Sequence, residues 1–176
     1  MRILLALSTA FIFQVSAQEI QPLFKLLDAK KTKVNFQNTI VENDTLNYFY
    51  YDNLYNGSGV SIGDINNDGL ADLYFVSNNQ ADQLYLNLGK MKFKNITEKA
   101  FPNQDQSGWH TAVSMADVNA DGWLDIYVCK HGIGQTDKVN YRNLLYINNR
   151  DNTFTERGKE FGIHDPGRSI DADFFD

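Results

Sequence analysis

A nine-residue acidic pattern occurs twice in the same register, and it constrains the fold more than any other feature of the chain. The pattern Asp-x-Asn-x-Asp-Gly-x-x-Asp spans residues 64–72 and returns at residues 117–125, a spacing of 53 residues. Its first, third, fifth and ninth positions offer side-chain oxygens, the seventh can add a backbone carbonyl, and the glycine permits a sharp turn. Such ligands suit hard cations, and Ca²⁺ is the expected ion.

Short apolar or alternating runs surround both loops in the same order and predict strands. The predicted ranges are 60–62, 73–76, 83–87 and 92–97 in the first copy, and 112–115, 125–128, 143–148 and 154–156 in the second. A third copy begins at residue 167, and Asp176 stands where the first ligand of its loop would be. A recurring four-stranded unit of about 40–50 residues is typical of a β-propeller blade.

The predicted fold class is therefore all-β: a partial β-propeller of four-stranded antiparallel blades, with a calcium loop between the first two strands of each blade. The predicted parts are a signal peptide (1–17), an irregular N-terminal segment (18–57), blade 1 (58–107), blade 2 (108–166) and the truncated start of blade 3 (167–176). Closed propellers need about four to eight blades. We therefore expect the chain to be the N-terminal fragment of a longer protein.

Composition and the N-terminus narrow the class of protein. The 22 acidic residues exceed the 16 basic ones, which argues against a nucleic-acid binder. Arg2, the apolar run 3–13 and the small-x-small residues 15–17 are typical of a secretory signal peptide, and that run is too short for a membrane span. Cys129 is the only cysteine, so an intramolecular disulfide is impossible, and we expect it to be a small buried hydrophobic residue.

Several motifs resemble the FG-GAP or VCBS type of calcium-binding repeat, as in integrin α-subunit propellers. The motifs are Gly59-Val-Ser-Ile-Gly-Asp64, Asp72-Leu-Tyr74, Gln83-Leu-Tyr-Leu-Asn87 and Phe93-Lys-Asn-Ile-Thr97. They are similar to those of secreted bacterial proteins related to the cartilage acidic protein and UnbV/ASPIC group. The resemblance covers residues 46–176 and does not include the UnbV/ASPIC module itself, so functions of that module are not expected here.

The resemblance implies a ligand set for each loop. In the first loop it implies the side chains of Asp64, Asn66, Asp68 and Asp72 with the carbonyl of Leu70, and in the second those of Asp117, Asn119, Asp121 and Asp125 with the carbonyl of Trp123. An EF-hand is rejected, because its glutamate would fall where the chain has Phe75 and Val128. Asp, Asn and Gly also favour plain tight turns. Two loops in identical register, each with three carboxylates that repel one another, favour a metal instead.

The predicted function is that of an exported calcium-binding scaffold, in the periplasm, at the cell surface or outside the cell, which binds a protein or a surface glycan. The alternative is the propeller domain of a secreted polysaccharide-active enzyme whose catalytic residues lie outside this chain, since no nucleophile with a base is evident in it. A purely structural surface protein is a third reading. For His110, His131 and His164 a solvated or hydrogen-bonded role is expected rather than catalysis. The long segment 131–142 is either a ligand-contacting loop or a surface insertion.

Overall fold

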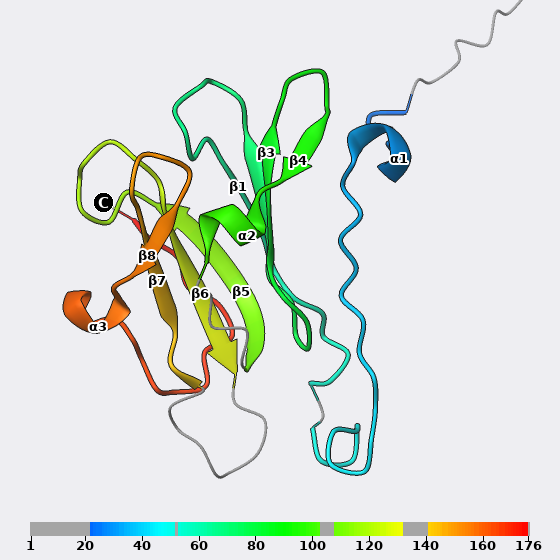
Figure 1. The fold of residues 1–176 in the computed structure, drawn as a ribbon. Coiled ribbons are helices and arrows are strands. Elements are labelled where there is room, and N and C mark those ends of the chain that lie inside the picture. The colour runs from blue at the N-terminus through cyan, green and yellow to red at the C-terminus, as the bar shows by residue number, and fades with distance from the viewer. Residues whose placement is uncertain (1–21, 52, 103–107, 132–140, 176) are drawn as a thin grey trace, which may run out of the picture.

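Two antiparallel four-stranded sheets make up most of the computed structural model, which describes residues 22–51, 53–102, 108–131 and 141–175. The first sheet has the order β1 (Val60–Gly63), β2 (Asp72–Phe75), β3 (Gln83–Asn87) and β4 (Phe93–Asn95). The second has the order β5 (Trp109–Ala116), β6 (Asp125–His131), β7 (Leu144–Asn148) and β8 (Phe154–Glu156). The predicted all-β class is confirmed at this level, and two such sheets side by side fit adjacent propeller blades (Figure 1). The predicted signal peptide and Asp176 lie outside the described residues.

In the described ranges three single-turn helices accompany the sheets: α1 (Ala29–Thr32), α2 (Thr97–Ala100) and α3 (Gly158–Phe161). The strand predicted over 92–97 is therefore wrong at its C-terminal end. There Asn95 Oδ1 accepts hydrogen bonds from the N–H (3.0 Å) and the hydroxyl (2.8 Å) of Thr97. This Asx turn ends β4 and starts the helix.

The two sheets approach most closely where β1 lies against β5, and the approach requires glycine. A Cβ on Gly59 would lie 2.8 Å from the Cα of Ala112, which is a backbone atom that cannot easily move away. A Cβ on Gly63 would meet the side chains of Leu124 and Met115 at 2.6 and 2.8 Å. Behind these strands the sheets enclose one core, to which the first contributes Tyr74, Val76 and Leu84, and the second Ile126, Val128 and Tyr146.

One pair of hydrogen bonds repeats from each copy to the next. The Ser58 hydroxyl donates to the carbonyls of Val76 (2.6 Å) and His110 (3.0 Å). Thr111 occupies the corresponding position in the second copy, and its hydroxyl donates to the carbonyls of Cys129 (3.3 Å) and Ser169 (3.0 Å). The start of the third copy therefore lies on the second sheet as the second sheet lies on the first.

The outer face of the second sheet carries its own apolar cluster. Tyr127, Cys129, Leu145 and Ile147 are buried there, and Ala172 of the third copy packs against them. Cys129 is only 1% exposed, which confirms that it is a buried apolar residue. Each sheet is thus built to be covered on both faces, as a repeat that stacks on its neighbours requires.

The N-terminal segment covers the outer face of the first sheet. Phe36 stacks on Phe75 with 4.9 Å between the ring centroids, and the Tyr85 hydroxyl donates to Asn35 Oδ1 (3.0 Å). Residues 34–36 and 39–41 of this segment belong to neither sheet. Over the described ranges, none of the helices has the length and apolar character needed to cross a membrane.

Candidate functional site

The first acidic loop joins β1 to β2 and curls around its own carboxylates. Asp64 accepts the N–H of Asp68 on Oδ1 (3.1 Å) and the N–H of Gly69 on Oδ2 (2.7 Å). Asp68 in turn accepts the N–H of Leu70 on Oδ1 (2.9 Å) and the amide of Asn66 on Oδ2 (3.0 Å). These hydrogen bonds turn the oxygens of positions 1, 3 and 5 toward the interior of one tight loop.

The ninth residue of the loop, Asp72, fixes the loop to the sheet. Its side chain is fully buried, and its carboxylate accepts the N–H of Ile65 on Oδ2 (3.1 Å) and the N–H of Asn87 on Oδ1 (2.7 Å). One side chain therefore connects the beginning of the loop to the end of β3. We call Asp72 and its counterpart Asp125 the anchoring aspartates.

The second loop, between β5 and β6, repeats this geometry. Asp117 accepts the N–H of Asp121 on Oδ1 (3.0 Å) and the N–H of Gly122 on Oδ2 (2.7 Å). Asp125 is 1% exposed. It accepts the N–H of Val118 on Oδ2 (3.1 Å) and the N–H of Asn148 on Oδ1 (2.8 Å). Four hydrogen bonds of the first loop, those accepted by Asp64 and Asp72, thus recur in the second with distances that agree to within about 0.1 Å.

The backbone shows why the sixth position is glycine. Gly69 and Gly122 have φ values of +83° and +85°, in the left-handed region that favours glycine. The fourth positions, Asn67 and Ala120, are also left-handed, with φ of +57° in both loops. The shared pattern therefore specifies one strained turn twice.

The negatively charged carboxylates of each loop repel one another. Burial raises the pKa of Asp72, hydrogen bonds from Asn87 and Ile65 partly offset the rise, and the negative charges of Asp68 and Asp64 add to it. A cation inside the loop would relieve that repulsion.

The second anchoring aspartate, Asp125, has the same electrostatic surroundings. Burial raises the pKa of Asp125, hydrogen bonds from Asn148 and Val118 partly offset the rise, and the charges of Asp121 and Asp117 add to it. Repulsion among the three carboxylates therefore recurs in the second loop.

The loops differ in the charge that lies next to them. Arg150, in the turn after β7, places Nη2 3.0 Å from Oδ2 of Asp121, and its hydrogen bond lowers the pKa of that carboxyl. In the first sheet the corresponding residue, two positions after Asn87, is Gly89. A cationic side chain therefore already neutralises one carboxylate of the second loop.

The structure brings the predicted ligands of each loop onto one turn without closing them into a metal cluster. Within the ranges that the structure describes, no three His, Cys, Asp or Glu side chains converge closely enough to hold an ion. The donor chemistry still fits Ca²⁺. Each carboxylate oxygen that accepts one N–H keeps a second lone pair, and the donors are the oxygens that a hard cation prefers.

His110 and His131 make structural contacts. His110 is buried, and its Nδ1 lies 2.8 Å from Oδ2 of Asp82, which also accepts the hydroxyl of Tyr74 (3.1 Å). His131 Nδ1 lies 3.1 Å from the hydroxyl of Tyr51. The hydrogen-bonded role predicted for these two histidines is confirmed. Most of the long segment 131–142, with the ligand contact suggested for it, lies outside the described residues.

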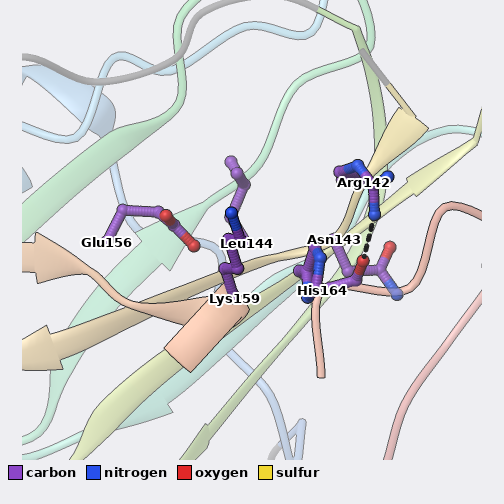
Figure 2. Close-up of a pocket in the computed structure, with 6 residues that line it drawn as sticks. All are labelled: Arg142, Asn143, Leu144, Glu156, Lys159 and His164. Carbon is purple, nitrogen blue, oxygen red and sulfur yellow. Dashed lines mark hydrogen bonds between the residues drawn. The ribbon is translucent and has the colours of Figure 1, made fainter. Parts of the chain in front are cut away.

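A surface pocket of about 280 Å³, at the corner formed by β7, β8 and α3, was not predicted from the sequence. Figure 2 shows the six side chains that line it: Arg142, Asn143, Leu144, Glu156, Lys159 and His164. They come from four separate stretches of the chain, so only the fold reveals them as a group. A position-by-position comparison of the two repeats is the sequence signal that could have pointed to these residues.

Residues 64–128 match the family model of the FG-GAP-like repeat. The match begins at the first residue of the first acidic loop and ends within β6, so it contains both loops and the first sheet from β2 onward. No curated protein is similar enough to the chain to count as a match.

Proposed function

We propose that this chain is part of an exported, calcium-stabilised β-propeller that acts as a non-catalytic binding scaffold for a protein or a surface glycan. The observation that carries the proposal is the repeated inter-copy hydrogen bond, from Ser58 to His110 and from Thr111 to Ser169. A unit that forms the same hydrogen bond with the preceding and the following unit can stack into a continuous array of blades. Such arrays present loops on a rigid scaffold, where binding residues concentrate.

In this proposal Ca²⁺ acts as a clamp in each acidic loop. The first loop would hold it with Asp64, Asn66, Asp68, Asp72 and the carbonyl of Leu70, and the second with Asp117, Asn119, Asp121, Asp125 and the carbonyl of Trp123. When bound, the ion would supply positive charge that offsets the repulsion among three carboxylates. With about 1 mM free ion and a site of about 0.1 mM affinity, each loop gains about 1.4 kcal/mol. That suits a structural clamp better than a switch.

Removal of calcium tests the clamp. The chain is unfolded with urea and digested with protease in 1 mM CaCl₂ and in EDTA. We expect a lower midpoint and faster cleavage in EDTA. Asp64→Asn together with Asp117→Asn should reduce the difference between the two conditions, because both loops lose a charged ligand. Identical curves in CaCl₂ and EDTA would refute the clamp.

Binding is tested separately from stability. The calcium-loaded chain is applied to arrays of bacterial and host glycans and of surface proteins, and turnover of the same glycans is followed by release of reducing ends. We expect saturable binding without turnover. Turnover would favour the propeller domain of a polysaccharide-active enzyme, and the absence of any saturable ligand would leave the purely structural reading.

A further inference from the structure

The pocket of Figure 2 has a counterpart in the first repeat, where the charges are different. From β3 onward, residues of the first repeat recur 61 positions later, as Tyr85 and Tyr146 do. The pocket lined by Ala81, Asp82, Gln83, Asn95 and Glu98 therefore corresponds to the one lined by Arg142, Asn143, Leu144, Glu156 and Lys159. The fold thus makes the same concavity twice and changes its lining.

The change concentrates positive charge in the second pocket. Ala81 is replaced by Arg142 and Glu98 by Lys159, so two cationic side chains face one acidic residue, Glu156. The first pocket is balanced, because Lys94 and Lys99 line it together with Asp82 and Glu98. In a chain with a net charge of −6, this local excess of cations favours an anionic ligand.

The back of the second pocket is rigid. Asn143 is 3% exposed, and its amide donates to the hydroxyls of Tyr127 (3.0 Å) and Ser169 (2.7 Å) while its Oδ1 accepts the N–H of Lys130 (2.8 Å). Arg142 Nη1 donates to the carbonyl of His164 (3.3 Å), which leaves most of its N–H groups for a ligand. This hydrogen bond restricts the guanidinium, which reduces the conformational freedom it loses when it binds.

The two ends of the pocket differ in chemistry. In Figure 2 Arg142 and His164 lie at one end, Glu156 lies at the other, and Lys159 lies between them. Glu156 Oε1 accepts the N–H of Gly158 (2.7 Å), which leaves Oε2 as an acceptor. A bare phosphate or sulfate would meet repulsion from Glu156. A ligand with a carboxylate at one end and hydroxyl groups at the other satisfies both ends.

We propose that this pocket binds a sugar acid, such as a uronic acid residue of an acidic glycan. The carboxylate pairs with Arg142 and Lys159, for which the planar guanidinium is well suited, and Glu156 accepts a hydroxyl of the ring. A volume of about 280 Å³ accommodates one hexuronate ring. The inference rests on the proposed scaffold function and names its ligand class.

The test titrates the calcium-loaded chain with sodium D-galacturonate, D-glucuronate and their di- and trisaccharides by calorimetry or NMR. D-galactose, D-glucose, acetate and sulfate serve as comparisons. We expect saturable binding of a uronate that is at least tenfold tighter than binding of the neutral sugar and of the simple anions.

Two matched variants locate the site. Lys159→Glu, which installs the residue type found at position 98, should weaken uronate binding at least tenfold. Lys94→Glu makes the same charge change in the other pocket and should leave binding unchanged. Both side chains are exposed, and circular dichroism confirms folding. If Lys159→Glu does not fold, Lys159→Gln and Arg142→Gln decide, each with an expected loss of at least fivefold.

Several results would overturn the sugar-acid proposal: equal affinity for galactose, equal losses in the two charge variants, no saturation with any uronate, or competition by an aspartate-rich peptide alone. A neutral glycan or a protein found on the arrays, without uronate binding, would leave the scaffold intact and refute only the sugar acid. Uronate turnover would refute the non-catalytic scaffold but not the ligand class.

Discussion

The two acidic loops have nearly the same hydrogen bonds and differ in the charge beside them. Asp64 and Asp117 each accept two N–H groups of their own loop, with matching distances. Among the residues that the structure describes, only the second loop is paired with a cation: Nη2 of Arg150 lies 3.0 Å from Oδ2 of Asp121. The pattern within the loop determines its backbone, whereas residues far away in the chain determine its electrostatic setting.

The pockets on the two sheets show the same division. Their positions are framed by corresponding strands and short helices, yet Ala81 and Glu98 in one repeat become Arg142 and Lys159 in the other. The two repeats thus share the acidic pattern that folds each loop and differ in residues at the surface. Substitutions at corresponding positions should therefore have equal effects on stability and unequal effects on binding.

The largest expected effect on stability comes from substitution of the anchoring aspartates. Asp72→Ala and Asp125→Ala each leave one buried and one partly buried N–H group without an acceptor, and a fully buried group costs about 1–3 kcal/mol. We expect each variant to lose about 2–4 kcal/mol of unfolding free energy, measured by urea unfolding in EDTA so that calcium does not contribute. The two losses should agree to within about 1 kcal/mol.

Asp68→Ala is the control, because Asp68 has an exposed carboxylate whose hydrogen bonds, within the described part of the chain, come from its own loop. It should cost less than about 1 kcal/mol in EDTA. A large difference between the losses of unfolding free energy in the Asp72 and Asp125 variants would show that the two aspartates do not stabilise their repeats in the same way.

A smaller effect is expected at Arg150 and would sharpen the difference between the loops. Arg150→Ala removes the cation that holds the pKa of the Asp121 carboxyl below its usual range. A metal ion then no longer competes with the guanidinium for that carboxylate. Because exposed pairs of this kind are weak, the second loop should bind a metal only about 1.4- to fivefold more tightly.

Terbium luminescence measures this loop selectively, since the indole of Trp123 in the second loop sensitises a bound Tb³⁺ and the first loop has Leu70 at that position. Lys92→Ala, in the turn between β3 and β4, is the control for a general change in net charge and should leave the signal unchanged. The gain should shrink as salt concentration rises. Unchanged or weaker Tb³⁺ binding in Arg150→Ala would contradict the competition.

Much of this fold could be predicted from sequence because its information is local. The acidic pattern and the apolar runs around it place the loops and most strands within a residue or two. The short helix that begins at Thr97 was missed, because the Asx turn at Asn95 competes with continuation of the strand. In this stretch a side-chain hydrogen bond outweighs strand propensity.

Contacts between distant residues could not be predicted from one sequence. Arg150 reaches Asp121 across 29 residues, and the buried pair of His110 and Asp82 spans 28. No local spacing encodes such pairs, since they depend on how the strands are placed beside one another. The same holds for the pocket residues, which only the corner of the second sheet brings together.

The smallest expected effect is at Cys129 and tests whether the cores of the two repeats are interchangeable. Val76 occupies the corresponding position in the first sheet, and the two residues are 0% and 1% exposed. Cys129→Val should therefore change the unfolding free energy by about 1 kcal/mol or less at pH 7. A loss above about 2 kcal/mol would show that the outer face of the second sheet packs differently from the inner face of the first.

At high pH the natural chain and Cys129→Val should differ in stability. Burial raises the pKa of the Cys129 thiol to about 12, and the charge of Asp171 adds to the rise. The neutral thiol's contribution to stability is fully present below the pKa of an unfolded cysteine, about 8.5, and is lost as pH rises toward the folded value. The natural chain should therefore lose stability relative to Cys129→Val between about pH 9 and 12, and iodoacetamide at pH 8 should label Cys129 only after unfolding. Rapid labelling of the folded chain would show that this face of the sheet opens to solvent, which its packing against the third copy argues against.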